Sequence, residues 1–420
     1  MKWFVSSKKA HCIIKKTLII IVFLFNFFAV NGQGIWTPKA DIPLARADAF
    51  SFSIGNKAYI GGGVYVSHVG LPLTYLSDFW EYDASLNTWT QIANFGGGVR
   101  SGGVGFSIGN KGYVGLGCDN NNNKFEDIWE YDPVTNIWTR KADYGGGKTE
   151  FPVGFSIGNK GYVGTGSDSN SSYTNSFWEY NPATNIWTQK SNLSGNGRWC
   201  AVGFSISNKG YIGTGLDEST GLPLNDFWEY DTTLNSWTQK ANFGGLSRWL
   251  ASSFSINNKG YIGIGIDISV NYLNDFWEYD PSVNQWQQKS NFPGNALAEG
   301  QSFSIGNKGY FGVGRSVSLL FKEIWEYDPS GAIGFTQLNN TNIPFSIYPN
   351  PFKFQTTIAF SEEQKNTIIK IIDALGEEIK VLKLTGKQLI INTDDIKSGT
   401  YFLNVINDYG SSFTRKIVIR

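Results

Sequence analysis

The sequence Asp78-Phe79-Trp80-Glu81-Tyr82-Asp83 decides the fold of this 420-residue chain, because the same six-residue pattern returns five more times with small changes. The copies recur at intervals of 48 to 50 residues. Their central tryptophans are Trp80, Trp129, Trp178, Trp228, Trp277 and Trp325. A repeat of this period is typical of propeller blades, in which each unit must stack on its neighbours to bury its faces. The sequence therefore predicts six copies of one structural unit.

Each copy contains four short runs of residues with high β propensity. In the second copy these runs are residues 106–108, 113–115, 128–131 and 137–139, and turn-forming residues separate them. The composition agrees with this pattern, since the chain has 49 Gly and 15% aromatic residues. Four strands per unit and six units predict an all-β, six-bladed β-propeller, which we place at residues 33–344.

The repeat resembles the Kelch repeat in the spacing from Tyr82 to Trp89 and in the Gly-rich strand end that precedes it. The resemblance covers about residues 36–338 and implies a Kelch-type propeller. It departs from the family pattern in one respect, because the Kelch glycine pair is intact only at residues 61–63. Residues 35–37 match the fourth strand of a blade, so we expect this N-terminal segment to close the ring. Closure by residues 334–337 is the alternative.

Residues 1–32 have the pattern of a secretory signal peptide. Five lysines and no acidic residue accompany a mostly apolar run at residues 17–30, which is too short for a lasting membrane anchor. We expect cleavage after Gly32, and an uncleaved signal anchor is the alternative. Cys118 and Cys200 lie in non-adjacent copies of the repeat, which predicts two free thiols.

The composition changes near residue 345, after which no tryptophan occurs, and short alternating strands, among them residues 357–360 and 368–372, predict a small β-sandwich at residues 345–420. This segment resembles the C-terminal sorting domain, type A, of the type IX secretion system. The matching positions are Tyr348, Pro349, Asn350, Pro351, Gly376, Gly399, Tyr401 and Lys416. The resemblance implies that the type IX secretion machinery is a partner, and that the protein crosses the outer membrane of a Gram-negative bacterium to be attached or released. An ordinary accessory β-domain is the alternative.

The candidate binding face carries the connections of variable length, because variable loops on a rigid frame are where recognition usually occurs. Two kinds of residue mark it, namely arginines six residues before the repeated Phe-Ser-Ile and tryptophans directly after two of them. They are Arg46, Arg100, Arg198, Arg248, Trp199 and Trp249. Guanidinium groups beside aromatic rings at the mouth of the channel suit an anionic sugar. A structural role for the arginines between blades is the alternative.

Several classes of function are disfavoured by the composition. The 35 basic and 35 acidic residues cancel, so nothing predicts nucleic-acid binding. Two histidines are too few for a copper oxidase or a common zinc site, and no Gly-x-Ser-x-Gly elbow is present. We therefore predict no metal and no cofactor. Glu81 and its counterparts recur in every copy, which indicates scaffold, and Asp119, Asp168, Asp217 and Asp267 are expected to cap turns.

These observations favour a secreted or cell-surface binding module, without catalysis, that recognises a glycan or a protein through its variable-loop face. The alternative is an enzyme that resembles the sugar-acid mutarotases and epimerases of Kelch architecture. Such an enzyme needs an acid outside the repeat register beside the channel mouth, and Glu150 and Glu299 are the candidates. A third possibility is surface adhesion without any small ligand.

Overall fold

The computed structural model describes residues 33–66, 72–317, 319–331, 345–373, 378–393, 395–406 and 412–420. The expected signal peptide, His68, the alternative closing segment at residues 334–337 and Gly376 lie outside these residues. The described part contains strands and no helix, and so no helix there is long and apolar enough to cross a membrane.

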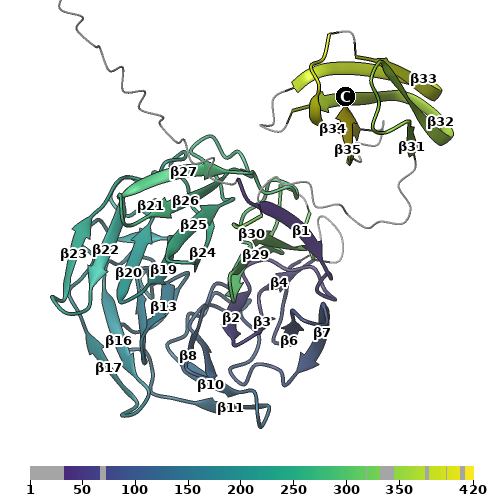
Figure 1. Cartoon of the computed structure of the whole chain (residues 1–420). Helices are drawn as coiled ribbons and strands as arrows, with labels where there is room; N and C mark the ends of the chain where they lie inside the picture. Colours follow the sequence, from purple (N-terminus) through teal and green to yellow (C-terminus); the bar gives the residue numbers. More distant parts are fainter. Residues whose placement is uncertain are drawn as a thin grey trace, which may run out of the picture. The chain divides into compact units, whose positions relative to one another are not determined.

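Six four-stranded antiparallel sheets form the larger part of the chain (Figure 1). The innermost strands are β2 (Phe50–Ile54), β8 (Val104–Ile108), β13 (Val153–Ile157), β19 (Val202–Ile206), β24 (Ser252–Ile256) and β28 (Gln301–Ile305). The second strands are β3 (Lys57–Gly61), β9 (Lys111–Gly115), β14 (Lys160–Gly164), β20 (Lys209–Gly213), β25 (Lys259–Gly263) and β29 (Lys308–Gly312). The third strands are β6 (Phe79–Asp83), β10 (Ile128–Asp132), β16 (Phe177–Asn181), β22 (Phe227–Asp231), β26 (Phe276–Asp280) and β30 (Ile324–Asp328). The outer strands are β7 (Thr88–Ile92), β11 (Ile137–Arg140), β17 (Ile186–Gln189), β23 (Ser236–Gln239), β27 (Gln285–Lys289) and, in the sixth sheet, β1 (Ile35–Lys39).

The six sheets close into a ring. Each innermost strand contacts the innermost strands of the sheets before and after it, and β28 returns to β2. The sixth blade is completed by β1, which pairs antiparallel with β30 from Ile35 opposite Asp328 to Lys39 opposite Ile324. The N-terminal closure expected from the sequence is therefore the one that the structure has.

Aromatic side chains fill the wedges between neighbouring blades. Phe52 of the first blade packs against Tyr131 of the second, with ring centroids 6.4 Å apart. The glycine of the repeated Gly-Tyr pair makes room for this packing, because a Cβ at Gly112 would lie 2.2 Å from the Phe52 ring. Burial of each such ring stabilises the fold by about 1.5–3 kcal/mol. The repeated glutamates serve the same frame, since the Tyr113 hydroxyl donates to Glu130 over 2.6 Å, as the equivalent tyrosine does in each of the other blades.

A second tier of very short strands lies on the face that carries the variable loops. Its members are β4 (Val64–Tyr65), β5 (Thr74–Tyr75), β12 (Thr149–Glu150), β15 (Ser167–Asp168), β18 (Arg198–Trp199) and β21 (Leu216–Asp217). Isolated bridges such as Trp249 with Ile266 and Ala298 with Arg315 repeat the same pairing in the remaining blades. The loop acids cap their own turns as expected, and Asp119 for example accepts the backbone N–H of Asn121 over 2.9 Å. This tier holds the residues between blades in a fixed register.

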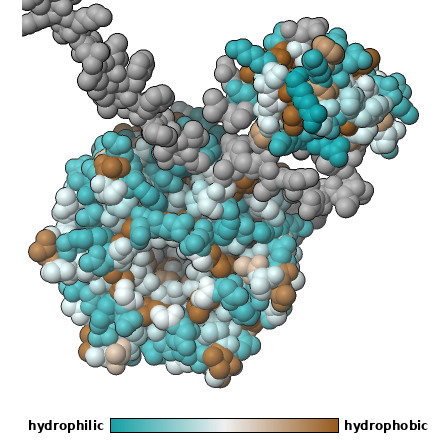
Figure 2. All heavy atoms as spheres, in the orientation of Figure 1, coloured by the Kyte–Doolittle hydropathy of each residue, from teal (hydrophilic) through white to brown (hydrophobic). Residues whose placement is uncertain are grey.

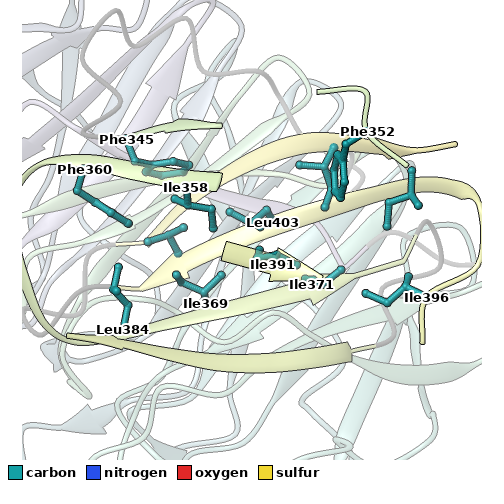
Figure 3. Packing of buried hydrophobic residues seen from close by; sticks show 13 residues of the cluster. Phe345, Phe352, Ile358, Phe360, Ile369, Ile371, Leu384, Ile391, Ile396 and Leu403 are labelled. Carbon is teal, nitrogen blue, oxygen red and sulfur yellow. The ribbon is translucent and has the colours of Figure 1, made fainter. Parts of the chain in front are cut away.

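The C-terminal β domain is made of β31 (Phe345–Tyr348), β32 (Gln355–Ile372), β33 (Glu378–Asn392), β34 (Gly399–Ile406) and β35 (Ser412–Ile419). The two strands expected at residues 357–360 and 368–372 are joined into the single long strand β32, which pairs with β33 through several register shifts. Buried side chains such as Ile358, Ile369 and Leu403 form its core (Figure 3).

Candidate functional site

Six residues in the left-handed conformation ring one mouth of the channel. They stand four residues before the Phe of each innermost strand or its equivalent, and their φ angles lie between 50° and 62°. They are Asp48, Gly102, Phe151, Cys200, Leu250 and Glu299. Backbone N–H groups of this ring donate to the carbonyl of the equivalent residue one blade earlier, as in Asp48 to Glu299 over 3.3 Å and Gly102 to Asp48 over 3.0 Å. The ring brings five different side chains and one glycine together at equivalent positions.

A small pocket of about 90 Å³ lies inside this ring. Phe151, Cys200 and Leu250 line one part of it, and Asp48 and Glu299 line another. It continues into the channel between the innermost strands, where a further 190 Å³ is lined largely by small and backbone groups. Figure 2 looks along the propeller axis and shows the face of the propeller hollowed at its centre. The two ionisable carboxyl groups are thus the charged groups that line the pocket.

The Asp48 and Glu299 carboxyl groups are hydrogen-bonded to each other. Burial raises the pKa of Asp48 well above its usual range, and the negative charge of Glu299 raises it further. Burial also raises the pKa of Glu299, although the nearby Arg315 guanidinium opposes this rise. Arg315 forms an ion pair with Glu299 at 2.5 Å while its own side chain is 46% exposed. Asp48 is accordingly the proton donor of the pair, and its second oxygen, Oδ1, has no partner among the described residues.

Aromatic rings continue from the pocket onto the loop face. The Phe151 ring contacts Trp199 edge-on at 5.3 Å. Trp199 in turn lies 5.8 Å from Trp249 and stacks on Tyr173 at 5.7 Å. Both tryptophans are partly exposed. The two tryptophans expected at the mouth are therefore adjacent there, and we call Phe151, Tyr173, Trp199 and Trp249 the aromatic shelf.

The four arginines occupy a different environment from the one that the sequence suggested. Arg46, Arg100, Arg198 and Arg248 are 0–1% exposed, and each guanidinium group donates to the carboxylate before the third strand of its own blade. In the fifth blade, Arg248 donates to both oxygens of Asp275, over 2.6 and 2.7 Å. A ligand in the channel mouth has no access to groups enclosed in this way. Their burial favours the alternative expectation, a structural role for the arginines. Each arginine joins segments within one blade, however, and not two neighbouring blades. The four arginines are therefore not part of the candidate site.

The two candidate acids have different surroundings. Glu150 lies in the tier above the ring, where it forms an ion pair with the buried Lys124 at 3.0 Å. It also accepts from the Cys118 thiol, whose pKa burial raises to about 12. Glu299 lines the pocket itself. The structure thus places Glu299, and not Glu150, beside a second carboxyl group in the channel mouth.

Asp48 is the residue that sequence reasoning missed. Asp48 and Glu299 both stand four residues before the repeated Phe. The sequence prediction rested on the position two residues earlier, where the arginines stand, and so did not reveal Asp48. A comparison of all six copies at this offset shows one glycine, three apolar or thiol side chains and two acids. The signal in the sequence was that this position differs in residue type from copy to copy, although all six copies place it around the channel axis.

The comparisons with known proteins agree with this division of the chain. Residues 346–420 match the family of secretion system C-terminal sorting domains. The chain carries a type IX sorting domain. Export to the cell surface or the medium and interaction with the type IX machinery follow from that domain. Among solved structures, YjhT, a Kelch-type propeller, matches with a TM-score of 0.58 and 16% identity, over 68% of this chain and 96% of that one. A search of curated proteins found no match.

Residues on which the resemblance to the sorting domain rests hold the last strand of this domain in place. The Asn350 side chain donates to the Lys416 carbonyl and accepts from the Val418 N–H, each over 2.9 Å. The adjacent Phe352 N–H donates to the Val418 carbonyl over 3.0 Å. Tyr401 donates its hydroxyl to the Lys397 carbonyl over 2.9 Å. The Tyr-Pro-Asn-Pro segment therefore fixes the C-terminal strand β35 from its side.

Proposed function

We propose that the exported propeller is a binding module that takes a glycan at the mouth of its channel, on the aromatic shelf and against the Asp48–Glu299 pair. The observation that carries this proposal is that two adjacent, partly exposed tryptophans lie next to a pocket whose carboxyl groups come from equivalent positions of different blades. Aromatic faces stack on the apolar faces of sugar rings, and carboxyl groups accept or donate hydrogen bonds to hydroxyl groups. Action at the outer surface of a Gram-negative bacterium completes the proposal.

The charge of the site differs from the expectation of an anionic sugar. The four arginines are enclosed, and the exposed guanidinium of Arg315 is already paired with Glu299. The pocket lining itself carries only acids among its charged residues. We therefore propose a neutral sugar as the ligand.

Ligand-observed NMR of the purified protein tests this proposal with glucose, N-acetylglucosamine and glucuronate. We expect saturation transfer to the neutral sugars, a loss of at least tenfold in affinity in Trp199→Ala and Trp249→Ala, and partial recovery in Trp199→Phe. Leu222→Ala, at an exposed position of the loop face, is the control. Transfer that survives both tryptophan variants, or transfer to none of the sugars, would contradict the proposal.

A second candidate function is proton-transfer catalysis of the mutarotase or epimerase kind. The carboxyl pair favours it, because two hydrogen-bonded carboxyl groups, of which Asp48 has a pKa raised well above its usual range, can act as acid and base toward one substrate. Exchange spectroscopy on the same sugars separates the two functions. Accelerated anomeric exchange that disappears in Glu299→Gln and Asp48→Asn, but persists in Glu150→Gln, would establish catalysis, and unchanged exchange rates would leave binding alone.

A further inference from the structure

The second blade shows how this fold encloses a guanidinium group. The Arg100 guanidinium carbon lies 4.0 Å from the centre of the Phe125 ring and 4.9 Å from that of Phe95. Its two terminal nitrogens donate to the Asp127 carboxylate over 2.6 and 3.2 Å. Trp129 holds the same carboxylate through its indole N–H over 2.7 Å. Two aromatic rings, a carboxylate and an indole thus form what we call the arginine socket.

The sixth blade has an aromatic or acidic counterpart for each of these four side chains but lacks the arginine. The counterparts of Phe95, Phe125, Asp127 and Trp129 are Phe292, Phe321, Glu323 and Trp325. The position of Arg100 is taken by Leu297, which is buried but has no polar group. A cavity of about 300 Å³ remains, lined by these five residues and by Gly294 among others.

The Glu323 carboxylate is accessible and can bind a cation. Its side chain is exposed, so the socket opens to solvent at this end. No described cation forms an ion pair with it, since the adjacent Lys322 ammonium pairs instead with Asp41 at 3.2 Å. The hydrogen bond that Glu323 accepts comes from the Lys322 backbone N–H over 3.3 Å. Glu323 therefore has one carboxylate oxygen without a partner among the described residues and a second that accepts only this long hydrogen bond, and both lie beside a cavity lined by Phe292 and Phe321.

The third blade shows that an absent arginine need not leave a socket. There Thr149 replaces the arginine, and Ser176 replaces the carboxylate as well. Tyr144 stands where the other blades have a residue such as Phe95, and its hydroxyl bonds to the Ser176 side chain and donates to the Val163 carbonyl over 3.3 Å. That blade has lost the charge together with the arginine. The sixth blade has lost only the arginine.

We propose that the socket of the sixth blade binds the guanidinium group of an external ligand, either the side chain of an arginine in a polypeptide or free arginine. A planar guanidinium group stacks on the faces of Phe292 and Phe321 and donates two parallel hydrogen bonds to Glu323. A lysine ammonium offers neither the planar face nor the paired donors, so the socket discriminates between the two cations. This site is independent of the glycan site proposed at the channel mouth.

Ligand-observed NMR and calorimetry on the full chain test the proposal, with N-acetylarginine methylamide, free arginine and N-acetyllysine methylamide as probes. We expect the blocked arginine to bind at least tenfold more tightly than the blocked lysine. Glu323→Gln should reduce this affinity at least tenfold, and the control Glu218→Gln, an exposed acid of the loop face, should leave it unchanged. Weaker binding of free arginine identifies a polypeptide side chain as the ligand, and tighter binding identifies the amino acid.

A second variant fills the socket from within. Leu297→Arg combined with Glu323→Asp rebuilds the arrangement of the second blade, and it should abolish binding of the probe while it raises the melting temperature. Equal affinity for arginine and lysine, unchanged binding in Glu323→Gln, or no binding of any probe at millimolar concentration would overturn the proposal. If the double variant fails to fold, the Glu323→Gln comparison still decides the outcome.

Discussion

The pairing of Arg248 with Asp275 allows a quantitative test of how the arginines act. Arg248 is fully buried, donates to both Asp275 oxygens and also donates to the carbonyls of Ile264 and Leu246 over 3.0 Å. We consider Arg248→Leu, which keeps the volume of the side-chain stem and removes the guanidinium. Loss of one partner of a buried ion pair costs about 3–5 kcal/mol, because the other charge is left without compensation. The Asp275 side chain is 21% exposed, so water relieves part of this cost and we expect the lower end, about 3 kcal/mol.

Tryptophan fluorescence during urea unfolding measures this change in the propeller alone, because no tryptophan follows residue 345. The expected effect is a lower midpoint with an unchanged slope, and a fall in melting temperature of about 6 °C or more. The double variant Arg248→Leu, Asp275→Leu supplies the rest of a mutant cycle. It should recover a large part of the loss, since no uncompensated charge then remains. A cost below about 1 kcal/mol for Arg248→Leu, with no recovery in the double variant, would refute the assignment of Arg248 to a buried ion pair.

Three further predictions concern other parts of the chain. Deletion of residues 33–39 removes β1 and leaves β30 without its outer partner, so the propeller should melt at a lower temperature, whereas deletion of residues 1–32 should not lower it. The pKa of Asp48 is raised in the folded protein, so the folded state binds this proton more tightly than the unfolded state does. The free energy of unfolding should therefore fall as pH rises above the pKa of the unfolded state, about 4, toward neutrality. Asp48→Asn should flatten this dependence in urea titrations from pH 4 to 8. Asn350→Ala removes both bonds of this side chain to β35, and hydrogen exchange should show faster exchange at Val418 with little change in the propeller.

The architecture could be predicted from the sequence because every blade repeats the same short sequence motifs. The aromatic pattern around Trp80, the turn residues and the glycine of the second strand recur in each copy, and each copy can pack only against another. Closure by β1 was predictable for the same reason, since residues 35–37 match the Trp-containing fourth strand of the other copies, whereas residues 334–337 have Phe in place of this Trp. The repeats made the strands of the propeller predictable. The long strand β32 was predicted as two separate strands, because the sorting domain has no repeat with which to compare it.

The sites were harder to predict, because they arise where the repeat is broken. The arginines appeared as a ring of binding groups since their partners, such as Asp78 and Asp127, are about 30 residues away and were not compared with them. Paired comparison shows that Thr149 coincides with Ser176 in the one blade without a carboxylate. Asp48 and Glu299 lie about 250 residues apart and meet only because the ring closes between them. No local pattern could have joined these two acids.

Closure by the first strand also governs when the fold can be completed. Synthesis delivers Ile35 at the start of the propeller and its partner Asp328 almost 300 residues later. Until the sixth repeat arrives, an unfinished chain has an open arc whose two end blades each lack a neighbour, and contacts over so long a separation form slowly. The meeting of the two ends also brings Asp48 to Glu299. A chain whose two ends have not met has neither the pairing of β1 with β30 nor the pair of Asp48 with Glu299. Closure of the ring and assembly of the channel mouth are therefore one step.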